Sequence, residues 1–201
     1  MTGRAAARAV LIGLLLAAPI AVAPADIAVA DGAAGIAAYE RGDYITALNE
    51  FAPLAEQGNA GAQTMLGIMY LRGQGVAPDL ALAARWLRAS AAQGNAQAQY
   101  RLAMMHLAGD GVVQDLVAAA ALLRAAAEQG LAQAQVNLAA MLYQGIGVTR
   151  DLRLSYLYAA LAARQGDAEG AGLVDLLAGA MTPADLAAAQ AMVAQWKRAA
   201  P

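Results

Sequence analysis

Three aspartates recur at one fixed interval, and they are the carboxylates best placed to suggest general acid–base chemistry. Asp79, Asp115 and Asp151 stand 36 residues apart, each shortly after a Gly-x-Gly pair. Acid–base catalysis needs a partner group of matched acidity within reach of the carboxylate, and no such group recurs with them. The pattern therefore favours a structural role at helix N-termini, where an acidic side chain accepts backbone N–H bonds.

The remaining residue types also argue against a catalytic or metal site. His106 is the single histidine and the chain has no cysteine, which excludes His–His metal pairs, thiolate ligands and disulfides. Gly73-x-Gly75 and its copies lack the preceding strand and following Lys-Ser/Thr of a phosphate-binding loop, and no Gly-x-Ser-x-Gly segment occurs. We expect no enzymatic activity, no cofactor and no metal, with His106 serving mainly in packing.

A 36-residue pattern organises the chain and would position all these residues. It runs through residues 60–95, 96–131 and 132–167. The positions that keep register include Gln63/Gln99/Gln135, Leu66/Leu102/Leu138, Met69/Met105/Met141, Gly73/Gly109/Gly145, Gly75/Gly111/Gly147 and Val76/Val112/Val148. Self-similarity at one period of this length predicts a stacked repeat architecture. The fold class expected is all-α, a solenoid of antiparallel helix pairs.

Start and stop signals define two helices in each repeat. Asn59, Asn95 and Asp167 stand where the first helix needs an N-cap, whereas Leu131 cannot cap. Glycine ends the first helix in a left-handed conformation, and the recurring aspartate begins the second. Residues 32–59 fit an atypical N-terminal capping repeat resembling a tetratricopeptide hairpin. Residues 168–201 fit a degenerate repeat and a C-terminal capping helix that begins at Thr182-Pro183-Ala184-Asp185.

The first 25 residues have the layout of a secretory signal peptide. Arg4 and Arg8 precede an uncharged apolar run, and small residues follow. Cleavage after Ala25 is favoured over cleavage after Ala30, and residues 26–31 would form a tether. The alternative is an uncleaved membrane anchor, but Pro19 and Pro24 would damage a spanning helix. We expect an exported, periplasmic protein that is soluble after cleavage.

The composition and net charge of the chain limit the classes of partner that it could bind. The whole chain has a net charge of −2, and loss of Arg4 and Arg8 leaves 11 basic against 15 acidic residues, or −4. This balance gives no electrostatic footprint for nucleic acid. Apolar residues make up 60% and charged residues 14%, which fits close-packed helices rather than disorder.

The repeat resembles the Sel-one-like repeat, a relative of the tetratricopeptide repeat. The resemblance lies in Ala62-Gln63, Leu66-Gly67, Tyr70, Gly73-x-Gly75-Val76, Asp79, Ala83, Trp86 and Ala91-Ala92-Gln93-Gly94. His106 and Leu142 depart from the family's tyrosine, and Leu122 departs from its aromatic residue. The resemblance implies a right-handed superhelix and scaffold or adaptor work, including exported members that bind envelope signalling proteins. A cysteine-rich secreted branch is linked to penicillin binding and β-lactam hydrolysis, and this cysteine-free chain does not resemble it.

The non-repeating positions of the first helices form the candidate binding site, because in related solenoids they line the concave surface. They are Thr64, Ile68, Leu71, Arg72, Tyr100, Met104, Leu107, Val136, Ala140 and Tyr143. A protein or peptide partner of the cell envelope would lie there as a helix or peptide in a groove. The alternative is that some of these residues pack between neighbouring first helices. The competing functions are a binder of cell-wall fragments or small molecules with weak β-lactam hydrolase activity, and a purely structural spacer.

Overall fold

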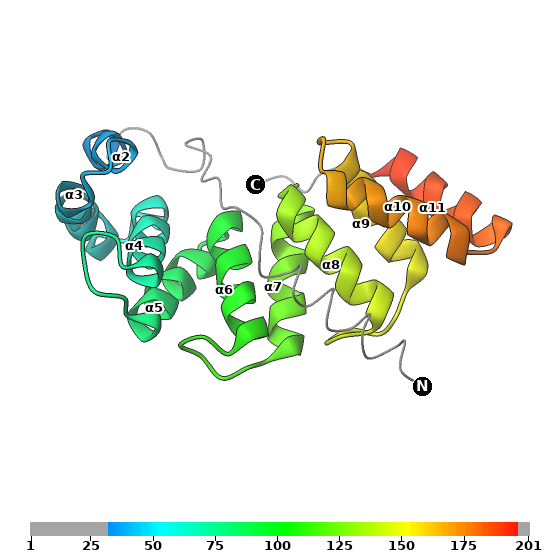
Figure 1. Cartoon of the computed structure of the whole chain (residues 1–201), viewed down its shortest axis with the longest axis horizontal. Coiled ribbons are helices and arrows are strands. Elements are labelled where there is room, and N and C mark those ends of the chain that lie inside the picture. The colour runs from blue at the N-terminus through cyan, green and yellow to red at the C-terminus, as the bar shows by residue number, and fades with distance from the viewer. Residues whose placement is uncertain (1–31, 197–201) are drawn as a thin grey trace.

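The computed structural model describes residues 32–196, which form ten helices and no strand (Figure 1). The predicted signal peptide, the tether and residues 197–201 lie outside this range. First helices, which open each pair, alternate with second helices. The first helices are α2 (Ala33–Glu40), α4 (Ala60–Arg72), α6 (Ala96–Ala108), α8 (Ala132–Gln144) and α10 (Ala168–Ala180). The second helices are α3 (Tyr44–Glu56), α5 (Leu80–Ala92), α7 (Leu116–Glu128), α9 (Leu152–Ala163) and α11 (Pro183–Gln195).

From α2 to α10, the helices pack chiefly on their neighbours in the chain. Each second helix contacts the first helix of its own pair and the first helix of the next pair. The pairs consequently follow one another across Figure 1 in chain order, from the blue end to the red end. A solenoid is defined by such nearest-neighbour packing, and the expected all-α solenoid of antiparallel helix pairs is confirmed.

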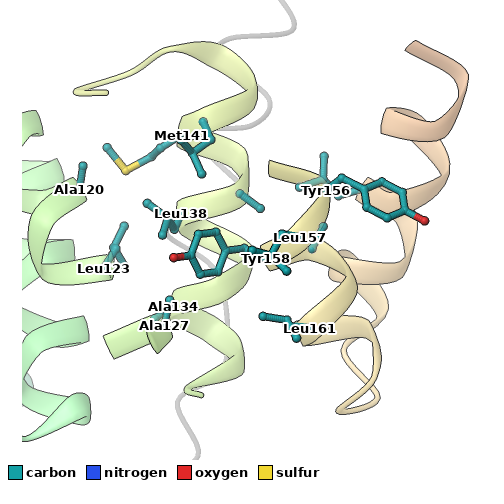
Figure 2. Packing of buried hydrophobic residues seen from close by; sticks show 14 of the residues in the cluster. Ala120, Leu123, Ala127, Ala134, Leu138, Met141, Tyr156, Leu157, Tyr158 and Leu161 are labelled. Carbon is teal, nitrogen blue, oxygen red and sulfur yellow. The ribbon is translucent and has the colours of Figure 1, made fainter. Parts of the chain in front are cut away.

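Alanine, leucine and methionine fill the interior between successive helices. Figure 2 shows Leu123 of α7, Leu138 and Met141 of α8, and Leu157 of α9 meeting in one buried cluster. Met69, Met105 and Met141, which share a repeat position, are all buried. The methionine ladder is therefore core, as the unbranched thioether fills irregular gaps between helices.

The helix caps follow the predicted pattern. The carboxylates of Asp79, Asp115 and Asp151 accept backbone N–H bonds in the first turn of α5, α7 and α9. Asn59 and Asn95 cap α4 and α6 in the same way. Leu131 makes no side-chain cap bond at α8, as expected of an apolar residue. The recurring aspartates are thus occupied in backbone bonds at helix ends.

Replacing Asp115 with alanine should lower the free energy of unfolding by about 1 kcal/mol. The carboxylate accepts from the amides of Val117 at 3.0 Å and Ala118 at 2.9 Å, and alanine leaves both amides without this acceptor. Asp110→Ala, in the exposed loop before α7, is the matched control and should change stability by less than about 0.5 kcal/mol. Chemical denaturation followed by circular dichroism measures both. Equal losses in the two variants would contradict the capping role.

A relay of glutamines ties three helices together at each repeat junction. Gln135 Nε2 donates to the carbonyl of Ala127 in α7 at 3.1 Å. Gln165, just after α9, donates to Gln135 Oε1 at 2.9 Å. The same two bonds recur from Gln63 and Gln93, and from Gln99 and Gln129. A buried amide satisfied on both sides fixes how one pair docks on the next.

The glycine pair in each long loop has two separate tasks. Gly145 has φ +71° and ends α8 in the left-handed conformation, as predicted. Gly147 has φ +66°, and a Cβ there would overlap the carbonyl of Leu116 at the start of α7. The loop after α8 therefore lies directly on the preceding second helix. The second glycine permits this contact between successive repeats.

The C-terminal unit departs from the hairpin pattern. Thr182 caps α11, with Pro183 in its first turn and Asp185 accepting a bond from the threonine hydroxyl, as the sequence predicted. However, α11 makes its main helix contact with α9 and not with α10. Ala189 and Val193 are buried there, and Trp196 lies edge-on to Tyr158. Without the long glycine loop, the last helix crosses back to cover the second helix of repeat three.

Candidate functional site

The candidate site is the side of α4, α6 and α8 that faces away from their core leucines. Successive residues of an α-helix are separated by about 100°, so positions two residues before, two after and five after each core leucine point to the opposite side. Positions one before and six after the leucine lie at the edge of that side. We call this side the first-helix surface. It carries the ten residues predicted above and also Arg101, Asn137 and Gln144.

The predicted binding residues divide by exposure. Buried members of the set are Thr64, Ile68, Tyr100, Val136 and Ala140. Half-buried members are Leu71, Met104, Leu107 and Tyr143, and Arg72 is exposed. Thr64 shows one reason for burial, because its hydroxyl lies 2.8 Å from that of Ser90 in α5. The accessible members thus lie in the second half of each first helix.

Half-exposed side chains recur at one position of this surface. Leu71, Leu107 and Tyr143 occupy the same place in α4, α6 and α8, one per repeat. Met104 lies one turn before Leu107 on α6. Arg150 places its guanidinium 5.7 Å from the centre of the Tyr143 ring. The surface therefore offers apolar and aromatic groups to a partner, with a cation beside Tyr143.

Three polar residues on this surface were not singled out from the sequence. Arg101 and Asn137 occupy the repeat position of Met65, and Gln144 occupies that of Arg72. Each has a buried polar atom without a hydrogen-bond partner among residues 32–196: Arg101 Nε, Asn137 Oδ1 and both amide atoms of Gln144. No other side chain of the described range has such an atom. Buried polar groups nearly always have a hydrogen-bond partner. The gathering of unpartnered atoms here therefore supports the first-helix surface as a candidate binding site.

The charge of Arg101 is surrounded by other first helices. Burial lowers the pKa of Arg101 to about 10, and Arg72 of α4 adds to the effect by repulsion. Tyr100 and Tyr39, the latter in α2, act in the opposite direction. Arg72 also donates to the hydroxyl of Tyr39 at 3.3 Å. Arg101 therefore remains charged at neutral pH, and side chains of α2 and α4 influence its charge.

Tyr100 links this basic end to the later repeats. Burial raises the pKa of Tyr100, and Glu169 in α10 acts in the same direction. Arg101 and the amide of Asn137 lower it. The first-helix surface thus carries arginines on α4 and α6 and the amide of Asn137 on α8. An acid, Glu169, follows beyond it on α10.

The other features of the described residues are a single histidine and a small hollow, with no cluster of metal ligands. No group of three or more His, Asp or Glu side chains within residues 32–196 could hold a metal ion. His106 is half-buried, with Nδ1 3.3 Å from the carbonyl of Val113. A hollow of about 250 Å³ lies between α9, α10 and α11 and is lined by Tyr156, Arg164 and Gln190 among others. Across the same range, no helix has the length and apolar character to span a bilayer.

Stacked helix pairs with recurring caps and glycine turns define a helical repeat protein of the solenoid class. The Sel1 repeat model matches residues 60–95, 96–131 and 132–167. The chain belongs to the Sel1 repeat family, and the expected resemblance is confirmed.

Solved structures agree with this assignment. A Sel1 repeat protein from Oxalobacter formigenes is 29% identical with a TM-score of 0.69, over 72% of this chain and 60% of that one. The protein c5321, a protective antigen of uropathogenic Escherichia coli strains displaying an SLR fold, is 26% identical with a TM-score of 0.56. That match covers 80% of this chain and 45% of c5321, so this chain spans less than two thirds of either solved chain. No curated protein matches the sequence.

Proposed function

We propose that the protein is a non-catalytic scaffold or adaptor of the periplasm that holds a protein or peptide partner on its first-helix surface. Proteins of the Sel1 repeat family mediate protein interactions. The observation that carries the proposal for this chain is the recurrence of Leu71, Leu107 and Tyr143, half-exposed at one position of three successive first helices. Such spacing suits an elongated ligand that crosses several repeats.

The export part of the proposal rests on the sequence of residues 1–25. A basic start, an apolar run and small residues before Asp26 support cleavage after Ala25. Intact-mass measurement of protein purified from the native envelope tests this, because a chain beginning at Asp26 is expected. A chain that retains Arg4 and Arg8 would contradict export by cleavage.

Site-specific photocrosslinking tests the binding surface. A photoreactive phenylalanine at position 107 or 143 should give discrete crosslinked products in the native envelope, because both positions would touch the partner. The same residue at position 88, exposed on second helix α5, is the matched control and should give none of these products. Identical products from positions 107 and 88, or no product from 107 and 143, would overturn the proposal.

Substitution gives an independent measure of the same surface. Leu107→Ser with Tyr143→Ser should remove most of the crosslinking from a third surface position, Met104, because the partner loses its apolar contacts. The loss expected is roughly 2 kcal/mol of binding free energy, or about thirtyfold in affinity. Circular dichroism must show unchanged helix content, since both side chains also pack against the core cluster. Unchanged crosslinking at Met104 in the folded double variant would contradict the prediction.

A further inference from the structure

Arg101 presents a charge that the described part of the chain does not neutralise. Its side chain is 4% exposed, and Nε has no acceptor within residues 32–196. The ion pair that this range does contain joins Arg153 to Asp185, on later helices. A buried guanidinium Nε without an acceptor is unfavourable, because this N–H loses its water and gains no hydrogen bond in return. The arrangement is therefore incomplete without an acceptor from outside.

The surroundings of Arg101 would strengthen the binding of an anion. Arg72 lies near enough to repel it, and Arg72 is exposed on the same surface. The Tyr100 ring packs 6.0 Å from the guanidinium carbon. Two like charges held together in a chain of net negative charge form a local basic site. An anionic group between them would relieve their repulsion as well as bond to the guanidinium.

The amides next along the surface identify the kind of anion. Within residues 32–196, Asn137 Oδ1 accepts no hydrogen bond of ordinary geometry, although the Tyr100 side chain lies near this amide, and neither amide atom of Gln144 has a partner. A phosphate has no N–H groups to satisfy these acceptors, whereas a peptide backbone provides N–H and C=O alternately. Met104 and Leu107 add half-buried apolar area nearby. A carboxylate carried on a peptide fits all of these groups.

We propose that the guanidinium of Arg101, assisted by Arg72, binds a carboxylate of an acidic peptide whose backbone amides bond to Asn137 and Gln144. The inference rests on the proposed function and specifies its ligand. The carboxylate belongs either to an Asp or Glu side chain or to the peptide's C-terminus. The guanidinium donates two parallel N–H bonds to either kind of carboxylate in the same geometry.

Peptide selection on the mature chain, residues 26–201, tests the proposal even while the natural partner is unidentified. The probe is a library of random linear peptides with free carboxyl ends, and one selected peptide is then synthesised for calorimetry. We expect the selected peptides to be rich in Asp and Glu. Arg101→Gln should lower the affinity for the synthetic peptide by roughly thirtyfold or more. Arg88→Gln, an exposed arginine of α5, is the control and should leave its affinity within about twofold.

Two further arms keep the result interpretable. Two changes to the peptide leave the protein untouched: its acidic side chains are changed to amides (Glu to Gln, Asp to Asn), or its C-terminus is amidated. One of the two should reproduce the loss seen with Arg101→Gln, and loss with neither would overturn the site. Arg101→Lys keeps the charge but not the fork and should show an intermediate loss. Amidation of the peptide's C-terminus distinguishes the two sources: loss on amidation assigns the terminal carboxylate, and retention assigns the side chain.

The possible outcomes separate this proposal from the broader one. Selected peptides without acidic residues, bound equally by the wild type and Arg101→Gln, would overturn the carboxylate site and leave peptide binding intact. Failure to select any peptide on the wild-type chain would count against the proposed function and against this site with it. If Arg88→Gln loses as much affinity as Arg101→Gln, the loss comes from the change in net charge and not from a specific contact. That result would also overturn the site.

Discussion

Replacing Gly147 with alanine should lower the free energy of unfolding by about 3 kcal/mol or more. Gly147 has φ +66°, a conformation that side chains with a Cβ rarely adopt. The new methyl group would also overlap the carbonyl of Leu116, which belongs to the preceding repeat. Because that neighbour is backbone, the loop must move away, and the contact between repeats two and three would be lost. Urea denaturation monitored by circular dichroism measures the change.

Gly172→Ala is the matched control for this experiment. Gly172 lies inside α10 on an exposed turn, and a Cβ there meets nothing within 4 Å. Alanine in a helix interior is favoured over glycine by roughly 0.5–1 kcal/mol, so this variant should be slightly more stable than the wild type. Opposite signs for the two variants would establish that the loop glycine serves the repeat junction. A similar small effect in both would contradict that role.

Features that recur in every repeat were predictable from the sequence. The fixed spacing of Asp79, Asp115 and Asp151 identified three helix starts, and the glycine pairs identified three helix ends. Leu131, the one exception among the first-helix caps of the three full repeats, was correctly expected to leave α8 without a side-chain cap. Repetition makes such predictions reliable, because each copy tests the interpretation of the others.

Partnerships between repeated positions were harder to predict. Gln63, Gln99 and Gln135 kept register in the sequence, and so did Gln93, Gln129 and Gln165. However, Gln135 lies in α8 and Gln165 lies 30 residues later, just after α9. Sequence spacing indicates which residues share a helix face, not which side chains meet across a helix pair. The contact of α11 with α9 has the same origin: without the long loop, no repeated signal specifies where the last helix packs.

The polar residues of the candidate site were missed for a related reason. One repeat position holds three different residue types: Met65 in the first repeat, Arg101 in the second and Asn137 in the third. Without a repeated type, the sequence gives no indication that these side chains are buried and lack partners. The available signal was a charged residue in the middle of an otherwise uncharged first helix. Only the three-dimensional arrangement shows that Arg72 of α4 and Tyr39 of α2 lie near enough to affect its charge.

Replacing Arg101 with methionine should raise the free energy of unfolding by about 2 kcal/mol. Methionine occupies the same position in the first repeat, where Met65 is buried in the core. The substitution removes a buried charge that has no acceptor in the described chain, and the flexible thioether can fill the space. Arg88→Met, on the exposed side of α5, should change stability by less than about 0.5 kcal/mol. Thermal and urea denaturation of the ligand-free protein measure both variants.

The stability gained in Arg101→Met should depend on pH if removal of the buried charge causes it. Burial lowers the folded-state pKa of Arg101 to about 10, well below its ordinary value, so above pH 10 the unfolded chain holds this proton more tightly than the folded chain. Wild-type stability, relative to Arg101→Met, should therefore rise as pH passes 10, and the gap between the two proteins should narrow. Tyr39, Tyr100 and Arg72 also face this site, so only the difference between the two proteins isolates Arg101. If Arg101→Met is instead less stable than the wild type at every pH, the guanidinium already has a partner within the chain. It would then not be available to bind an acidic peptide.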